Sequence, residues 1–229
     1  MKFKISVAIL CGLLFLGFTA QAQDWPNLGR YRAHDDSILA LKNHHVEAVF
    51  MGNSITDFWI KFCPEFFSKN HYLDRGISGQ TTPQILLRFR ADVIDMHPKV
   101  VLILAGTNDI AGNTGPATPK MIEDNLASMC DLATAHHIRV VLCSLLPALD
   151  YWWHKGVHPA PKIVALNKWI KSYAQKHHYV YLDYFSKLAD KNNGFKKSLS
   201  DDGVHPNLAG YKVMMPMAQK AIAEALHQH

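Results

Sequence analysis

A hydroxyl, an imidazole and a carboxylate in this chain have the types and the spacing that nucleophilic catalysis requires. Ser54 lies in the segment Gly-Asn-Ser-Ile-Thr, and His205 follows Asp202 by three positions in the segment Asp-Gly-Val-His-Pro. A serine hydroxyl becomes a nucleophile when a base accepts its proton, and that base needs an acceptor to orient it. Because one loop can present Asp202 and His205 together, the sequence offers Ser54 a base and its orienting group.

Two further segments carry candidate donors for the negative charge that develops in acyl transfer. Arg-Gly-Ile-Ser-Gly ends at Gly79, and Gly-Thr-Asn-Asp places the side-chain amide of Asn108 next to Asp109. Taken singly, Ser54 fits a helix cap and Gly79 a turn glycine. Asn108 and Asp109 alone fit a loop and helix cap, and for Asp109 we keep this structural role.

Five apolar segments rich in branched residues predict the strands that position these groups. Four of them do not alternate with polar residues, which indicates strands covered on both faces, as in a parallel sheet between helices. The segments are 46–51, 100–105, 140–145 and 179–182, with a weaker one at 71–73.

Helical patterns lie between the predicted strands, at 83–96, 119–136, 161–177 and from about 207. In the second, Thr118 can cap, and the apolar side chains of Ile122, Leu126 and Met129 fall on one face. We expect Pro216 to kink or interrupt the last helix. Strands that alternate with helices predict right-handed crossovers and a three-layer α/β sandwich.

The candidate groups follow three successive predicted strands. In open parallel sheets, ligands bind beyond the carboxyl ends of the strands, where the connecting loops converge. Ser54 comes directly after the first strand, Gly79 after the second and Asn108 after the third. The sequence therefore predicts that a hydroxyl, a glycine turn and an amide meet at one edge of the sheet.

These four segments, in this order, resemble the four sequence blocks of the SGNH/GDSL hydrolase family, from about 46 to 211. The resemblance implies a parallel, flavodoxin-like sheet and a triad of Ser54, His205 and Asp202. It also implies an oxyanion hole formed by the backbone N–H groups of Ser54 and Gly79 and the side-chain amide of Asn108. Such a hydrolase requires no metal or organic cofactor.

The chain departs from the family pattern at Asn53, where the first block usually has Asp. Because Asn53 is not the triad acid, this change bears on loop geometry or substrate preference rather than on the nucleophile. Thr56 stands where a Gly-x-Ser-x-Gly motif would have its second glycine, which argues against the α/β-hydrolase fold.

The N-terminus has the pattern of a secretory signal. Lys2 and Lys4 precede an apolar run, and Ala-Gln-Ala ends at Ala22. The apolar run is shorter than the roughly 20 residues that span a bilayer, so cleavage is favoured over an uncleaved anchor. We expect a signal peptide at 1–22 and one domain at 23–229, exported to the periplasm or secreted, with no stable membrane insertion after cleavage.

Composition argues against several other classes of protein. Without Lys2 and Lys4, 22 basic residues face 19 acidic ones, and this net charge of +3 is too small and too scattered to predict nucleic-acid binding. Three cysteines remain at irregular spacing, so at least one is unpaired, and for Cys130 and Cys143 we expect buried thiols rather than a disulfide framework. The pairs His136-His137 and His177-His178 end predicted helices, where a structural role is favoured over metal binding.

The predicted function is hydrolysis of carboxylic esters with small or short acyl groups, with acetylated carbohydrate as the suggested substrate. Trp152 and Trp153 follow the fourth strand and are candidate substrate contacts, although core packing explains them equally well. The first alternative is a phospholipid, lysophospholipid or platelet-activating-factor-type acylhydrolase. The second is a noncatalytic carbohydrate-binding module. The sequence leaves the oligomeric state open.

Overall fold

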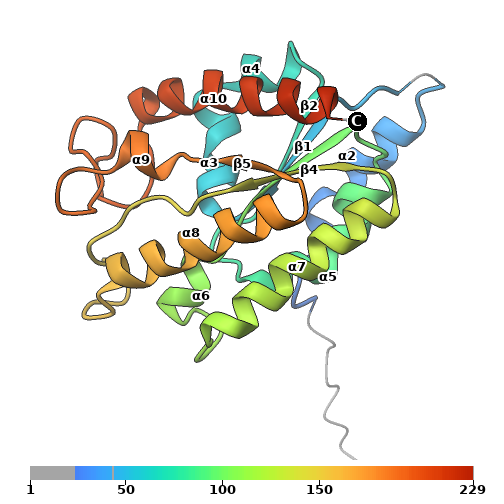
Figure 1. The fold of residues 1–229 in the computed structure, drawn as a ribbon. Helices are drawn as coiled ribbons and strands as arrows, with labels where there is room; N and C mark the ends of the chain where they lie inside the picture. Colours follow the sequence, from blue (N-terminus) through green and yellow to red (C-terminus); the bar gives the residue numbers. More distant parts are fainter. Residues whose placement is uncertain (1–23, 43, 229) are drawn as a thin grey trace, which may run out of the picture.

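Five parallel strands form the central sheet of the computed structural model, which describes residues 24–42 and 44–228. The predicted signal peptide lies outside these residues. The strand order is β2-β1-β3-β4-β5, as in flavodoxin-like folds, so the predicted sheet is confirmed. Helices lie on both sides of the sheet (Figure 1). The strands are β1 (Ala48–Gly52), β2 (Tyr72–Gly76), β3 (Val100–Leu104), β4 (Arg139–Cys143) and β5 (Val180–Leu182).

Alternate residues of each strand pack into two separate hydrophobic cores, one on each face of the sheet. Val49 and Met51 face the first core, whereas Ala48 and Phe50 face the second. The first is covered by α5 (Thr82–Phe89), a π-helical turn η1 (Arg90–Ile94), α7 (Pro119–Ala135) and α8 (Pro159–Lys176). The second is covered by α3 (Ser54–Phe62), α4 (Pro64–Ser68) and α10 (Leu208–His227). The three-layer sandwich is therefore confirmed.

The predicted second helix begins and packs as its sequence indicates. The Thr118 side chain accepts a hydrogen bond from the Met121 N–H at 3.3 Å, which caps α7. Four of its buried residues lie three or four positions apart, namely Ile122, Leu126, Met129 and Ala133. Capping and an apolar stripe together fix where this helix starts and which face it buries.

Helix α10 continues through Pro216, so of the predicted kink or interruption the interruption does not occur. A proline inside a helix removes one backbone hydrogen bond and crowds the preceding turn. Residues on both sides of it are buried against the sheet, among them Tyr211 and Met214 before it and Ala218 and Ile222 after it. This packing keeps the two halves of the helix together.

Helix α2 (Gly29–Leu39) was not predicted, because it has no apolar stripe. Its docking is polar. Asp35 is buried and pairs with the guanidinium of Arg75 in β2, and the Tyr31 hydroxyl donates to the Gly76 carbonyl. The helix therefore attaches to the β2 edge of the sheet through contacts that no periodicity in the sequence reveals.

The histidine pairs and the cysteines have the structural positions expected of them. Helices α7 and α8 end one residue before His136 and His177, and His137 and His178 adopt left-handed backbone conformations with φ of 59° and 58°. Among the described residues, Cys63, Cys130 and Cys143 are unpaired, and the latter two are buried. No helix within the described part of the chain is long and apolar enough to cross a membrane.

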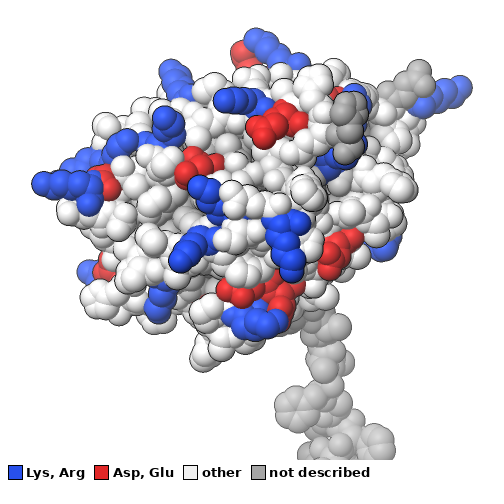
Figure 2. All heavy atoms as spheres, viewed as in Figure 1, with Lys and Arg blue, Asp and Glu red and all other residues white. Residues whose placement is uncertain are grey.

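Acidic and basic side chains are interspersed on the surface. On the face seen in Figure 2, Lys and Arg residues alternate with Asp and Glu residues rather than forming a field of one sign. Some exposed charges pair along helices, such as Lys120 with Asp124 and Lys69 with Glu65. Exposed pairs of this kind contribute little to stability, because solvent screens both charges.

Candidate active site

The candidate groups meet where the strand order changes direction. Strand β1 lies between β2 and β3, so the chain leaves β1 toward one edge of the sheet and later returns to its other side. Gly52 at the end of β1 is in register with Gly76 of β2 and Leu104 of β3. Ser54 and Asn108 therefore follow neighbouring strand ends at a topological switch point, where α/β folds bind ligands.

The turn before Ser54 leaves the serine hydroxyl free. Asn53 is the N-cap of α3, and its side-chain oxygen accepts the Ile55 N–H at 3.1 Å. The turn is tight, because a Cβ on Gly52 would lie 2.2 Å from the Thr56 hydroxyl and 2.8 Å from the Leu104 carbonyl. The interpretation of Ser54 as the cap is therefore wrong, since Asn53 has that role.

Ser54, His205 and Asp202 form a continuous hydrogen-bonded chain. The Ser54 Oγ lies 2.9 Å from the His205 Nε2, and the His205 Nδ1 lies 2.6 Å from the Asp202 Oδ2. Because Nδ1 faces a carboxylate, the neutral imidazole carries its proton there and leaves Nε2 as the acceptor for the serine proton. This is the arrangement of a nucleophile, a base and an orienting acid.

The short loop that carries the acid and the base fixes the carboxylate in place. The other Asp202 oxygen, Oδ1, accepts the backbone N–H groups of Val204 at 2.9 Å and His205 at 2.7 Å. Partial burial raises the pKa of Asp202. Hydrogen bonds from the His205 side chain and from these two N–H groups together lower it by more, so the pKa lies below its ordinary value. The carboxylate therefore stays ionised beside the imidazole.

Gly79 lies on the loop after β2 and Asn108 on the short helix α6 (Thr107–Ala111), and these two segments touch each other. Gly79 has a φ of 81°, and a Cβ built on it would meet no heavy atom within 4 Å, so it borders open space. The buried Asn108 amide donates to the Gln80 carbonyl at 2.9 Å. An amide group has two N–H donors, and this contact uses one of them. Among the described contacts, none uses the second N–H.

Asp109 joins the loop after β3 to the start of α5. Its carboxylate accepts the Thr82 N–H at 3.0 Å and the Thr82 hydroxyl at 2.6 Å. Burial raises its pKa, while the hydrogen bonds from Thr82 act in the opposite direction. These contacts support the structural role predicted for Asp109, since they hold neighbouring Asn108 in position.

Aromatic side chains border the imidazole. The Phe58 and Trp153 ring centroids lie 5.2 and 6.4 Å from that of His205. The Trp153 indole N–H donates to the Asn113 side chain at 3.0 Å, and the Asn113 amide donates to the Gly79 carbonyl at 3.1 Å. Trp153 is therefore tied to the glycine loop. Trp152 packs edge-to-face on Trp153 and is 63% exposed.

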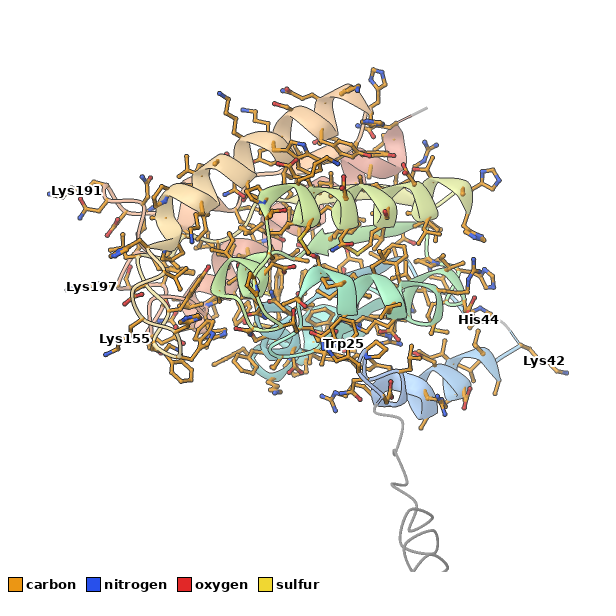
Figure 3. The ribbon with its side chains drawn as sticks, turned by 90° about the horizontal axis from the view of Figure 1, so that it is seen from below. Trp25, Lys42, His44, Lys155, Lys191 and Lys197 are labelled. Carbon is orange, nitrogen blue, oxygen red and sulfur yellow. The ribbon has the colours of Figure 1, made fainter. Side chains whose placement is uncertain are left out.

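Long loops after β4 and β5 surround this edge of the sheet. They reach beyond the strand ends and carry Lys155, Lys191 and Lys197 at their outer surface (Figure 3). Short helix α9 (Phe185–Leu188) lies at the start of the second loop, and α6 (Thr107–Ala111) carries Asn108. Within the described ranges, no group of three or more His, Cys, Asp or Glu side chains is arranged to hold a metal ion.

Two residues at the site were missed by the sequence analysis. Asn113 links Trp153 to Gly79, and the Ser78 hydroxyl donates to the Asp57 carboxylate at 2.5 Å. Ser78 precedes Gly79, and Asp57 lies in the helix that begins at Ser54. No local pattern marks these residues, because their roles come from contacts between distant segments.

Comparisons with known proteins identify the family to which the chain is similar. The model of the GDSL-like lipase/acylhydrolase family matches residues 50–213. A candidate acylhydrolase from Bacteroides fragilis NCTC 9343 is 43% identical, with a TM-score of 0.85 over 90% of this chain and 100% of that one. A GDSL-like lipase from Bacteroides thetaiotaomicron VPI-5482 is 40% identical, with a TM-score of 0.85 over 88% and 100% of the two chains.

A mammalian relative is more distant. The platelet-activating factor acetylhydrolase IB subunit alpha1 of Bos taurus is 29% identical over 145 residues, which are 61% of this chain and 57% of that protein. The chain thus matches less than two thirds of that relative's length. The predicted resemblance to such subunits is confirmed at the level of sequence similarity.

Proposed function

The chain belongs to the GDSL-like lipase/acylhydrolase family and is a carboxylic ester hydrolase, and on that premise we propose that it cleaves esters of small or short acyl groups. Ser54 is the nucleophile, His205 the general base and Asp202 the residue that orients it. The observation that carries this assignment is the hydrogen-bonded chain from the Ser54 Oγ to Nε2, at 2.9 Å, and from Nδ1 to the carboxylate, at 2.6 Å.

The proposed reaction has two halves. His205 accepts the Ser54 proton as the hydroxyl attacks the ester carbonyl, and the tetrahedral oxyanion receives hydrogen bonds from the N–H groups of Ser54 and Gly79 and from the Asn108 amide. His205 then returns the proton to the leaving alcohol, which leaves an acyl-enzyme. A water molecule repeats the sequence on the acyl group and frees Ser54.

The aromatic border of the site favours a leaving alcohol with a flat apolar face, and acetylated carbohydrate fits this description. Exposed Trp152 and partly buried Trp153 offer ring surface beside His205, and sugar rings stack on such surfaces. An apolar cavity of about 390 Å³ lies between α6, α7 and α8, but its lining includes neither Ser54 nor His205. A short acyl group suits this site better than a long chain.

A phospholipid or platelet-activating-factor-type acylhydrolase is the second candidate. The similarity to the bovine acetylhydrolase subunit favours it, because that protein is named for removing an acetyl group. The platelet-activating-factor type shares the small acyl group with the first candidate and differs in the leaving alcohol, whereas a phospholipid acylhydrolase also differs in its long acyl group. A sugar hydroxyl belongs to the first and a glycerol-based lipid to the second.

We also infer that residues 1–22 direct export and are removed, so that residues 23–229 act in the periplasm or outside the cell. The support is the basic start, the apolar run and the Ala-Gln-Ala site in the sequence. Mass measurement of the exported protein should give an N-terminus at Gln23. An intact Met1 on the exported protein would contradict the inference.

The experiment that tests the proposed function is a substrate panel on the purified protein. It compares p-nitrophenyl esters of increasing acyl length, acetylated xylose and an acetylated glycerophospholipid. We expect rapid cleavage of acetate and butyrate, poor cleavage of long-chain esters and faster deacetylation of the sugar than of the lipid. Greater turnover on the lipid would instead establish the second candidate.

Matched serine variants complete this experiment. Ser54→Ala should abolish hydrolysis, whereas Ser198→Ala should not, because Ser198 is an exposed serine in the loop that precedes His205. Unchanged activity in Ser54→Ala would refute the assigned nucleophile.

A further inference from the structure

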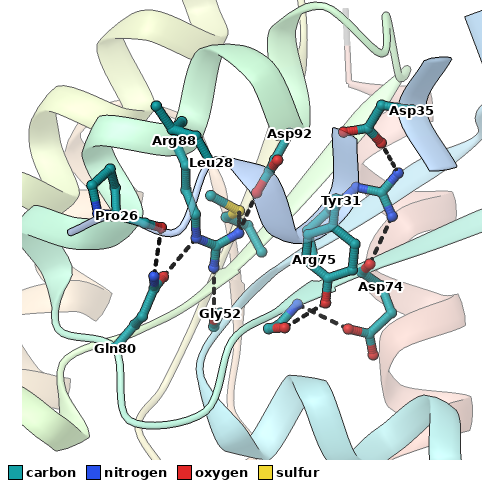
Figure 4. A network of polar contacts seen from close by, with 12 residues as sticks. Pro26, Leu28, Tyr31, Asp35, Gly52, Asp74, Arg75, Gln80, Arg88 and Asp92 are labelled. Atoms are coloured by element: carbon teal, nitrogen blue, oxygen red, sulfur yellow. Dashed lines mark hydrogen bonds and ion pairs between the residues drawn. The ribbon is translucent and has the colours of Figure 1, made fainter. Parts of the chain in front are cut away.

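A buried polar cluster lies directly beneath the candidate site, and the proposed reaction does not use it. Its centre is Arg88 of α5, whose side chain is fully buried. The guanidinium Nη2 donates to the Gly52 carbonyl at 2.8 Å, Nε donates to the Gln80 side-chain oxygen at 2.6 Å, and Nη1 pairs with Asp92 (Figure 4). One side chain therefore joins the turn before Ser54 to the loop that carries Gly79.

Gln80 uses its polar atoms to join three separate segments. Its amide nitrogen donates to the Pro26 carbonyl at 2.7 Å, and its side-chain oxygen accepts from Arg88 (Figure 4). Its backbone carbonyl accepts the Asn108 amide at 2.9 Å. Contacts with Arg88 and Pro26 therefore fix the Gln80 side chain, and the Gln80 carbonyl in turn binds the Asn108 amide.

Gly79 depends on its neighbours for its position. It has no side chain to anchor it, and its φ of 81° is a conformation that the flanking residues must maintain. On one flank the Ser78 hydroxyl binds Asp57, and on the other Gln80 binds Arg88 and Pro26. Both anchors are side-chain contacts to segments distant in the sequence.

The chemistry of the cluster suggests that it provides more than stability. Burying a guanidinium and a carboxylate carries a large desolvation cost, and apolar residues of similar volume often give equal or greater stability. An apolar core cannot replace the planar guanidinium of arginine, whose N–H donors fix a carbonyl and an amide at defined angles. The guanidinium of Arg88 fixes such a pair beside the nucleophile.

We propose that Gln80 and Arg88 are positioning residues of the oxyanion hole, which act by setting the Gly79 loop and the Asn108 amide relative to Ser54. This inference rests on the proposed function, because it concerns the same site. Preorganised donors stabilise the transition state only when they are aimed at the developing charge, and small displacements cost large factors in rate. The roles are indirect, since neither side chain touches the substrate.

The test compares two identical substitutions on neighbouring glutamines. Gln80→Met removes the contacts to Arg88 and Pro26, whereas Gln84→Met removes contacts to Thr81 and to the Trp25 carbonyl without touching Arg88 or Asn108. We expect Gln80→Met to lower kcat on an acetate ester by about ten- to a hundredfold with KM within about twofold. Gln84→Met should keep kcat within about twofold of the wild type. The kinetics of each variant are measured well below the midpoint of its thermal unfolding.

A double-variant cycle separates positioning from general loosening of the fold. Because Gln80 is proposed to position Gly79 as well as the Asn108 amide, Gln80→Met combined with Asn108→Ala should lose clearly less kcat than the product of the two single losses. Losses that multiply in the double variant would overturn the proposal. So would a kcat for Gln80→Met within about twofold of the wild type.

A second variant keeps the proposal testable if Gln80→Met does not fold. Gln80→Asn keeps an amide but is one methylene too short to reach both partners, and it should lower kcat in the same way. If Ser54→Ala is inactive and the Gln80 variants keep full activity, the positioning role of Gln80 is refuted and the proposed function stands. An active Ser54→Ala protein would refute the proposed function itself.

Discussion

At the turn that follows β1, two neighbouring side chains have separate roles. Asn53 satisfies the first backbone N–H groups of α3, and this leaves the Ser54 hydroxyl to His205. An asparagine oxygen can accept the same hydrogen bond as the aspartate usual in this family block, but it brings no negative charge next to the nucleophile. The departure at Asn53 thus preserves the cap and changes the local electrostatics.

Removing the charge of Asp202 should affect catalysis far more than folding. In Asp202→Asn, the amide no longer holds the His205 proton on Nδ1, so Nε2 is no longer presented as the base, and kcat should fall on the order of a thousandfold or more. Asp201→Asn is the matched control, because Asp201 is the adjacent exposed aspartate and binds only Asn207 among the described contacts. Steady-state kinetics on an acetate ester measures both. A loss in Asp202→Asn no larger than in the control would contradict the role of Asp202.

Asp74 in β2 should make stability depend on pH. Burial, together with the nearby charge of Asp57, raises its pKa from 3.8 to about 7, although the Gly76 N–H and Arg75 act in the opposite direction. Between these two values the folded protein retains a proton that the unfolded chain has lost, so this group lowers the free energy of unfolding as pH rises through that window.

The variant Asp74→Asn removes this dependence, because its oxygen can still accept the Gly76 N–H and its amide needs no proton. Its stability relative to the wild type should rise between pH 5 and pH 7, by up to a few kcal/mol, and level off above that range. Urea unfolding across the pH series measures the difference, with exposed Asp131→Asn as the control. A difference that does not change with pH would show that Asp74 is not the titrating group.

At the scale of elements, the close approach of α3 to β2 sets where Ser54, the proposed nucleophile, lies. A Cβ on Gly76 would come within 2.0 Å of the Asp57 nitrogen, in the backbone of α3. Gly76→Ala must therefore push the helix away from the sheet, and we expect a loss of about 3 kcal/mol or more in the free energy of unfolding, with reduced activity.

Gly29→Ala provides the comparison for that change. Gly29 begins α2, and the nearest heavy atom to an added Cβ is 3.5 Å away, an ordinary contact distance. The same substitution there should leave stability within about 1 kcal/mol of the wild type. Thermal unfolding of Gly76→Ala and Gly29→Ala measures the difference. Equal unfolding midpoints would contradict the close packing of α3 on Gly76.

The elements differ in how far the sequence predicts them. All five strands and the long helices α7 and α8 follow from apolar runs and caps, because each buries a continuous apolar surface. Helix α2 lacks such a surface, and the course of α10 through Pro216 depends on packing that only the folded protein provides. Pattern analysis detects local preference and burial, so elements held by polar contacts escape it.

The residues of the candidate site also differ in how far the sequence predicts them. Ser54, Asp202 and His205 lie within short segments whose residue types indicate their chemistry, and the fold brings the three together. Gln80 and Arg88 carry no such signal. Their significance lies in contacts to carbonyl groups 36 to 54 positions away, which no local pattern specifies.

At the scale of the whole molecule, the sheet order places the site. Because β1 lies between β2 and β3, and both of these strands end in register with it, three loops open at the carboxyl edge of the sheet. The last loop of the chain then brings His205 back to Ser54 across 151 positions. The first and last parts of the domain must both be folded before the site exists.

Covalent labelling of the purified protein with a fluorophosphonate probe, followed by mapping of the modified peptide by mass spectrometry, tests the central claim most directly. Activated serine nucleophiles react with such probes, so the account predicts a single adduct on Ser54. The adduct should be lost after heat unfolding and strongly reduced in His205→Ala. An adduct on another serine, or equal labelling of the unfolded protein, would contradict the assignment of Ser54 as the activated nucleophile.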